Sequence, residues 1–268
     1  MKLTTELLYS LCLAGSALAA PRSGLAERIQ ARTLDRQTHP LQPIAPNEEY
    51  RTLANIQYSN NWAGAVRTSP PPEGAYTEVS ASFVVPEPKA IANSEGTQAA
   101  SAWVGIDGDT YTAAILQTGV DFYIDNGKPV YHAWYEWFPE KAYDFDLVVN
   151  PGDVIFTSVQ SFSPSEGIAI VENLSTGQKA SQTISAPNGD ATLAGQNADW
   201  IVEDFQSGGT LVNLVDFGTV SFSGAGATAG GARFGVKDAG IIELKQGDKV
   251  LTDVEILSDS DLDVSFTG

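Results

Sequence analysis

The side chains that could do chemistry in this 268-residue sequence are mainly carboxylates, amides and aromatic rings. There are two histidines, and His39 lies close to the N-terminus, so a Ser-His-Asp triad would have to use His132, which no G-x-S-x-G elbow accompanies. The single cysteine, Cys12, lies in an apolar N-terminal stretch, so disulfides and typical zinc sites are not expected. The sequence also lacks a glycine-rich phosphate loop and the paired Asp-Thr/Ser-Gly signature of aspartic proteases. We therefore expect no metal and no cofactor.

Gln117 stands out because it lies in the middle of an apolar strand predicted over Thr112–Tyr123. Strand side chains alternate between faces, so Gln117 shares its face with Gly119 and Asp121. If this amide is buried without partners, the cost is about 1–3 kcal/mol. Two interpretations remain open at this point: a polar residue on a solvated sheet face, or an amide donor held on a rigid strand beside a reaction centre.

Two carboxylates are embedded in aromatic segments. In Tyr131–Glu140, strand alternation places Glu136 on one face with Trp134 and Phe138. In the segment D-W-I-V-E-D-F, Glu203 lies between two large apolar side chains, an environment that raises a carboxyl pKa by desolvation. For each residue the alternative is a glutamate on a solvated or edge strand.

The elements that must position these side chains are strands. From Ile56 onward, short alternating runs recur between turn signals, which predicts an all-β sandwich or barrel without substantial helix. Gly224–Gly231 is expected to be a flexible loop, and Asp107-Gly108-Asp109 a tight hairpin turn. The predicted strands are Asn61–Arg67, Ala75–Val85, Ala100–Asp107, Thr112–Tyr123, Val130–Phe138, Val154–Ser163, Gly167–Asn173, Lys179–Ser185, Asp199–Phe205, Gly218–Ser223, Ile241–Lys245 and Lys249–Leu257.

The N-terminal region divides into a predicted signal peptide, Met1–Ala20, and a basic segment, Pro21–Asn55. The basic segment carries five Arg against four acidic residues, whereas the rest of the chain, residues 56–268, has a balance of −19. The segment is interpreted as a linker or as a pro-segment that lies on the acidic body. We expect a secreted, extracellular, monomeric protein with one folded domain, and no apolar run after the signal is long enough to cross a membrane.

The acidic surface of the body disfavours binding to nucleic acid and to anionic membranes. It is also consistent with an acidic habitat or with simple solubility. Asn173-Leu174-Ser175 is a glycosylation sequon, a pattern that is common by chance.

Five motifs together resemble the glutamic peptidases, or eqolisins, which are secreted and mostly fungal acid endopeptidases. They occur in order from about Asn60 to the C-terminus, and are Asn61-Trp62-Ala63-Gly64, Trp103-Val-Gly-Ile-Asp-Gly-Asp, Ile115-Leu-Gln-Thr-Gly, Trp134-Tyr-Glu-Trp and Ile201-Val-Glu-Asp-Phe. The resemblance implies a sandwich of two long antiparallel sheets, a catalytic pair of Gln117 and Glu203, and a pro-segment that inhibits the enzyme until it is removed in acid. It also implies insensitivity to pepstatin.

Peptide hydrolysis by such a pair requires an activated water and a donor for the tetrahedral oxyanion. Glu203 would act as general base and then as acid, while the Gln117 amide would stabilise the oxyanion. The substrate-binding residues implied by the resemblance are Trp62, Trp103, Asp107, Asp121, Trp134, Glu136 and Phe138. Of these, Trp62, Trp103, Trp134 and Glu136 are expected to line the cleft, and Asp107 and Asp121 to orient the polar groups. The sequence departs from many relatives in having His132 where some have Asp.

A carbohydrate enzyme or lectin on the same kind of sandwich is the alternative function. Glu136 and Glu203 would then be a glycosidase carboxylate pair, and the tryptophans would stack on sugars. Activity on denatured protein in acid, compared with activity on xylan or glucan, separates the two hypotheses.

Overall fold

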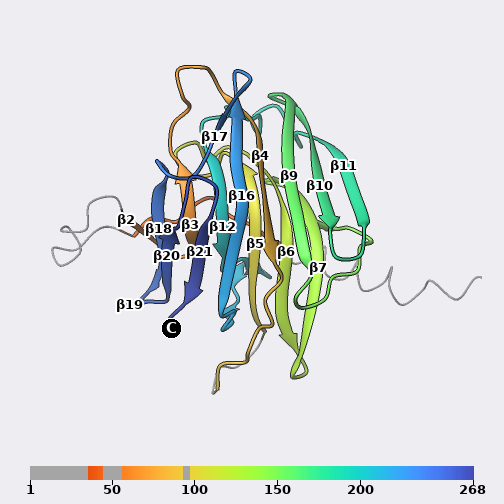
Figure 1. Cartoon of the computed structure of the whole chain (residues 1–268), viewed down its shortest axis with the longest axis vertical. Coiled ribbons are helices and arrows are strands. Elements are labelled where there is room, and N and C mark those ends of the chain that lie inside the picture. The colour runs from red at the N-terminus through yellow and green to blue at the C-terminus, as the bar shows by residue number, and fades with distance from the viewer. Residues whose placement is uncertain (1–35, 45–55, 93–96) are drawn as a thin grey trace, which may run out of the picture.

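The computed structural model describes residues 36–44, 56–92 and 97–268. The predicted signal peptide and most of the basic segment lie outside these residues. The described chain forms strands and no helix, arranged as two large sheets that face each other (Figure 1). The expectation of an all-β sandwich is confirmed.

The first large sheet has eight strands. They are β4 (Tyr76–Val84), β9 (Val154–Ser163), β10 (Glu166–Asn173), β11 (Gln178–Ser185), β16 (Thr219–Ala229), β17 (Ala232–Phe234), β20 (Thr252–Ile256) and β21 (Leu262–Phe266). Their order is β11-β10-β9-β4-β16-β21-β20, with β17 paired to β16, and all these pairs are antiparallel.

The second large sheet has ten strands and carries the site described below. They are β2 (Ile56–Ser59), β3 (Trp62–Arg67), β5 (Gln98–Ile106), β6 (Ile115–Asp125), β7 (Lys128–Phe138), β8 (Tyr143–Asp144), β12 (Ala198–Glu203), β15 (Asn213–Leu214), β18 (Gly240–Gln246) and β19 (Lys249–Val250). The order is β19-β18-β3-β12-β5-β6-β7-β8, with β15 on β5 and β2 on β18. A small third sheet joins β1 (Arg36–Gln37), β13 (Gln206–Ser207) and β14 (Thr210–Leu211).

The core between the large sheets follows strand alternation. In β6, Leu116 and Val120 belong to the inter-sheet core, while Ile115 belongs to a second apolar cluster on the opposite face, together with Trp62 and Trp103. Each large apolar side chain buried in this way contributes about 1.5–3 kcal/mol. The predicted facing of β6 is therefore confirmed, and Gln117 is buried rather than solvated.

Two local predictions were wrong. The connection between β5 and β6 is a long loop rather than a tight turn, because it wraps around Asn197, whose Oδ1 accepts the N–H groups of Asp109, Thr110 and Tyr111. The glycine-rich run does not form a loop over its whole length, because β16 continues to Ala229. Its alanines point into the core and are fully buried, and a register shift after Ser223 accommodates the glycines.

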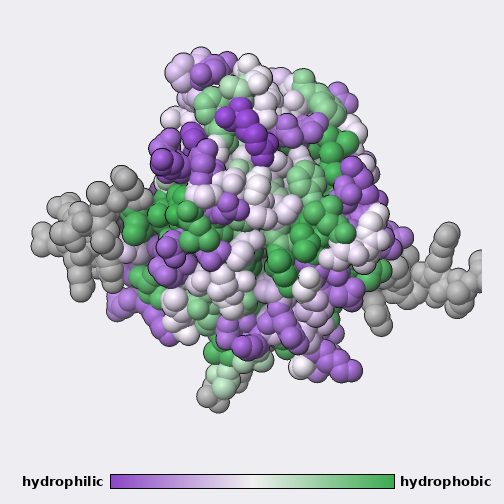
Figure 2. Space-filling view, in the orientation of Figure 1, coloured by the Kyte–Doolittle hydropathy of each residue, from purple (hydrophilic) through white to green (hydrophobic). Residues whose placement is uncertain are grey.

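Figure 2 shows hydrophilic and apolar residues interspersed over one face of the molecule. In the part of the chain that the structure describes, no helix is long and apolar enough to cross a membrane.

Asn173 is the sequon asparagine, and it is fully buried. Its Nδ2 donates to Val148 O at 3.1 Å and to Asp153 Oδ2 at 2.8 Å, and its Oδ1 accepts the N–H groups of Ser175 and Thr176. A glycan on Nδ2 would disrupt this arrangement. We predict that the folded protein carries no glycan at Asn173, so glycosidase treatment leaves its intact mass unchanged. A peptide map with a glycan on Asn173 would contradict this.

Candidate active site

The floor of the site is the face of the ten-stranded sheet that points away from the inter-sheet core. Five adjacent strands, β3, β12, β5, β6 and β7, lie in a register that aligns side chains across them. Along one row, Trp62 lies opposite Glu203, Glu203 opposite Ser101, Ser101 opposite Asp121, and Asp121 opposite His132. Residues distant in sequence are thereby brought to one line across the sheet.

A parallel row, two steps along the same face, holds the predicted amide. Gln117 lies between Gly105 on β5 and Glu136 on β7, and Asp199 lies on the other side of Gly105. Gln117 and Glu203 therefore share one face, with the row of Trp103 and its neighbours between them.

Trp103 connects the two rows. A Cβ added at Gly105 would lie 2.8 Å from Trp103 Cζ3, so the indole packs against the glycine beside Gln117. At its other end the Trp103 Nε1–H donates to Glu203 Oε2 at 3.0 Å. The indole thus spans the space between Gln117 and Glu203 and fixes the orientation of the Glu203 carboxyl group.

Glu203 is fully buried. Burial raises its pKa to about 8, Glu136 adds to that effect, and the positive charge of Arg36 acts in the opposite direction. Its second oxygen, Oε1, accepts the backbone N–H of His39 at 3.3 Å.

Gln117 is also fully buried, and neither its Oε1 nor its Nε2 has a hydrogen-bond partner among the described residues. The same holds for the indole Nε1–H of Trp62, which stands opposite Glu203. Because unpaired buried polar groups are costly, these atoms are candidates for contacts with a ligand.

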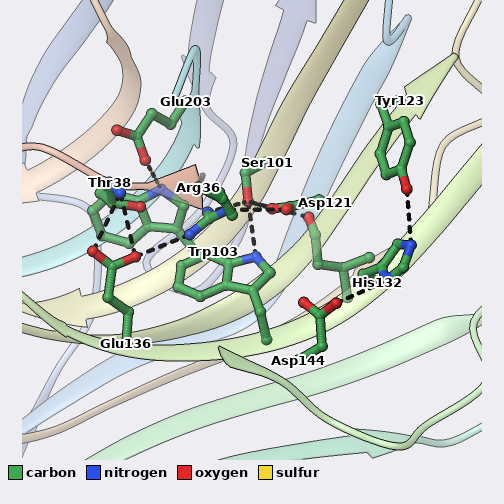
Figure 3. A network of polar contacts seen from close by, with 12 residues as sticks. Arg36, Thr38, Ser101, Trp103, Asp121, Tyr123, His132, Glu136, Asp144 and Glu203 are labelled. Carbon is green, nitrogen blue, oxygen red and sulfur yellow. Dashed lines mark hydrogen bonds and ion pairs between the residues drawn. The ribbon is translucent and has the colours of Figure 1, made fainter. Parts of the chain in front are cut away.

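Arg36, from the N-terminal basic segment, lies in this site (Figure 3). Its Nε pairs with Asp121 Oδ2 and its Nη1 with Glu136 Oε2, each at 2.9 Å. The guanidinium stacks over Trp134, 3.8 Å from the ring centroid. Burial alone would lower the pKa of Arg36, but the surrounding carboxylates, Asp121 first, hold it above its ordinary value.

A network of hydrogen bonds extends from Arg36 along the sheet. Ser101 Oγ donates to Asp121 Oδ1 at 2.6 Å and accepts the Trp134 Nε1–H at 3.0 Å. Further along the same face, His132 bonds to Asp144 Oδ2 and to the Tyr123 hydroxyl, both at 2.9 Å (Figure 3). Ser101 and Arg36 were not predicted as site residues, because no local pattern distinguishes them.

The rest of segment 36–44 follows the cleft. The backbone N–H of Thr38 donates to Glu136, and that of Leu41 donates to Gly108 O at 3.0 Å. His39 makes an edge contact with Phe138, with ring centroids 5.7 Å apart. Leu41 packs into the apolar cluster that contains Trp62. The segment therefore covers both rows of the floor.

Six of the seven predicted substrate-binding residues lie together in the structure. Trp62, Trp103, Trp134, Glu136, Phe138 and Asp121 all lie on the floor or against segment 36–44. Asp107 is held by a different part of the chain. Its carboxylate points to the loop before β12 and accepts four backbone N–H groups from residues 194–197, which positions the β5–β6 connection instead.

Other carboxyl groups are buried nearby. Burial raises the pKa of Asp199 well above its ordinary value, and Asp109 and Asp107 add to the shift. Neither oxygen of Asp199 has a hydrogen-bond partner among the described residues. Burial also raises the pKa of Asp204 to about 7. Within residues 36–44, 56–92 and 97–268, no group of three or more His, Cys, Asp or Glu side chains is arranged to hold a metal ion.

Comparison with known proteins gives consistent matches. Residues 60–266 match the model of the Peptidase A4 family. The chain is 42% identical to Aspergillopepsin-2 of Aspergillus niger, over 97% of this chain and 98% of that protein. It is 36% identical to Scytalidopepsin B of Scytalidium lignicola, over 96% of each. A crystal structure of scytalido-glutamic peptidase with a transition state analog inhibitor superposes with a TM-score of 0.70 and 35% identity, covering 78% of this chain and 98% of that one.

The buried acids predict how stability depends on pH. A carboxyl group whose pKa is raised by folding stabilises the protein below its unfolded pKa, and this contribution is lost as pH rises toward the folded value. For Asp199 the loss begins near pH 4, at about 1.4 kcal/mol per pH unit. We predict that Asp199→Asn raises the free energy of unfolding near pH 6 and has little effect near pH 3.

Urea unfolding of the parent and the variant across this pH range measures this. The control is Asp248→Asn, a substitution at an exposed turn. Parallel stability curves for the parent and Asp199→Asn between about pH 3 and 6 would contradict the prediction.

Proposed function

The chain belongs to the Peptidase A4 family, the glutamic peptidases, and on that premise we propose that it hydrolyses peptide bonds with Gln117 and Glu203. The observation that carries the proposal is the placement of both side chains on one buried face, connected by the Trp103 indole. Family membership also removes the support for a carbohydrate enzyme based on Glu136 and Glu203.

In the proposed reaction, the Glu203 carboxylate takes a proton from a water molecule as the water oxygen bonds to the scissile carbonyl carbon. The carbonyl oxygen becomes an oxyanion, which accepts a hydrogen bond from Gln117 Nε2. Such a donor contributes about 2.7–4 kcal/mol in other acyl-transfer enzymes. Glu203 then returns the proton to the leaving nitrogen as the carbon–nitrogen bond breaks. An amide donor suits acidic conditions because it does not titrate.

Segment 36–44 covers the site and therefore also affects the pKa of Glu203, the proposed base. With the site closed, burial holds the pKa of Glu203 near 8, so the group is protonated at neutral pH and cannot accept a proton from water. Departure of the segment would admit water, which lowers this pKa by reducing desolvation, but it would also remove Arg36 and the His39 N–H, which hold the pKa down in the closed site. Glu203 serves as the base in acid where the gain in solvation is the larger of the two effects.

We propose that residues 21–55 form an inhibitory pro-segment. Arg36 supplies a cation between two carboxyl groups, and the backbone of His39 donates to Glu203. No group of the described segment bonds to the Gln117 amide, so the segment touches the base without offering a carbonyl to the oxyanion donor. This arrangement supports binding without hydrolysis.

Processing in acid follows from the charge difference between the segment and the rest of the chain. Arg36 stays charged at all relevant pH values, whereas the acidic residues of 56–268 take up protons as the pH falls, so the attraction that holds the basic segment weakens. We place the cleavage near Leu53–Ser59. The N-terminal part of that range is favoured, because Ile56–Ser59 pair with β18 and cleavage before Ile56 keeps β2 intact. The mature product would be a secreted endopeptidase acting on protein or peptide substrates as a monomer.

The first test of the proposed reaction is the pair of substitutions Glu203→Gln and Gln117→Ala. Each should lower kcat by about 10²–10⁴-fold, because one removes the proton carrier and the other the oxyanion donor. Peptide hydrolysis in acid by the mature enzyme measures this, with circular dichroism to establish folding. Glu243→Gln is the matched control, because Glu243 is buried between β18 and β20, bonded to Thr252 and Val254. Retention of a tenth of the activity by Glu203→Gln would exclude Glu203 as the base.

The second test concerns the pro-segment. We predict that Arg36→Gln moves the activation of the purified precursor to higher pH, because the segment loses its buried ion pairs. Arg28→Gln removes the same charge from the leader and should move the midpoint less. Mass and activity are followed together as the pH is lowered stepwise from 7. Equal midpoints for the two variants would show that net charge, rather than the Arg36 site, holds the segment. A Glu203→Gln precursor that shortens at the wild-type rate would show that processing is not self-catalysed.

A further inference from the structure

Asn61 contacts the main chain of the covering segment at three points. Its Nδ2 donates to His39 O at 3.2 Å and to Pro40 O at 3.3 Å, and its Oδ1 accepts the Gln42 N–H at 2.9 Å. Asn61 is fully buried at the start of β3. One amide group thus binds two carbonyls and one N–H of an extended peptide.

These contacts do not depend on the side chains of the bound segment. A carboxamide offers both donors and acceptors, and the backbone carbonyl and N–H groups that it binds here recur in other peptides. The same contacts are therefore available to other chains that follow this path, provided that a residue with an N–H stands at the third contact point.

The Asn61 amide is held rigidly. Ser59 Oγ donates to Asn61 Oδ1 at 2.9 Å and accepts the backbone N–H groups of Asn61 and Trp62. On the other side, Asn61 O accepts the Asp204 N–H at 2.8 Å. Because Asp204 directly follows Glu203, the position of Asn61 relative to Glu203 is set by the β3–β12 pairing. A peptide bound by Asn61 is thereby held at a fixed distance from Glu203.

We propose that Asn61 is a substrate-positioning residue, which binds the main chain on the C-terminal side of the scissile bond. This inference rests on the proposed function, because it takes segment 36–44 to follow the path of a substrate. The His39 nitrogen, which donates to Glu203, marks the position of the leaving nitrogen. Asn61 then binds the carbonyls of the first and second residues after the scissile bond and the N–H of the fourth.

The test compares two peptide substrates that share their N-terminal half. One extends four residues beyond the scissile bond, and the other ends after one residue as an amide, so it offers one of the three contacts. In the wild type the longer substrate should have the higher kcat/KM. In Asn61→Ala the kcat/KM of the longer substrate should fall by about tenfold to a thousandfold, as expected for the loss of three hydrogen bonds, mainly through KM. The shorter substrate loses one hydrogen bond and should be affected less, so the preference for length becomes smaller.

Asn60→Ala is the matched control, because the Asn60 side chain makes a single long contact, 3.5 Å, to the Gln42 side chain. It should keep the length preference. If Asn61→Ala does not fold, the wild-type enzyme can be tested with an ester in place of the amide N–H of the fourth residue. That ester should lower kcat/KM by about threefold to tenfold.

An unchanged ratio between the long and short substrates in Asn61→Ala, or an ester that is cleaved as fast as the amide, would overturn the proposal. Neither result would bear on the Gln117 and Glu203 pair, which is tested separately by the inactivity of Glu203→Gln. A uniform loss on both substrates would show that Asn61 only supports the fold.

Discussion

A slip of one residue between β12 and either of its neighbours would turn Glu203 into the inter-sheet core and Val202 onto the cleft floor, because strand side chains alternate between faces. The same slip would expose the apolar residues that hold the two sheets together. Burial of apolar side chains in the core therefore fixes the strand register, and the strand register fixes the positions of the site residues. Backbone hydrogen bonds of three adjacent strands, β12, β5 and β6, rather than a loop, set the positions of Gln117 and Glu203 relative to each other.

The carboxyl groups buried on the floor of the site are costly to ionise. Glu136, Glu203 and Asp199 are fully buried, and burial raises the pKa of each, so the folded state favours their neutral forms. Acid supplies the protons that these groups require, whereas neutral pH penalises them. The covering segment offsets part of that penalty by placing Arg36 among the carboxyl groups. On the proposed function, activity in acid and inhibition by the basic segment both follow from the same buried acids.

Local patterns were enough to predict most of the long strands and the facing of Gln117, Glu136 and Glu203, because alternation with apolar neighbours can be read from adjacent residues. They missed β21 and predicted β19 and β20 as one strand. They could not predict contacts between distant segments. Asp107 was expected among the substrate-binding residues, whereas the backbone amides of residues 194–197 bind it, and only the folded loop brings those amides together. Arg36 and Asn61 were missed for the same reason, since their partners lie far away in the sequence.

On the proposed function, an inhibitory segment differs from a substrate at this site by one carbonyl group, the one that bonds to Gln117. Asn61 and Glu203 both bond to the main chain of segment 36–44, so the segment is aligned as an extended peptide, yet the Gln117 amide has no partner in it. A bound peptide whose scissile carbonyl reaches Gln117 completes the hydrogen bonds that the segment leaves unmade, and that bond strengthens as the oxygen becomes an oxyanion. Selectivity for reaction over mere binding therefore depends on the donor that the segment does not use.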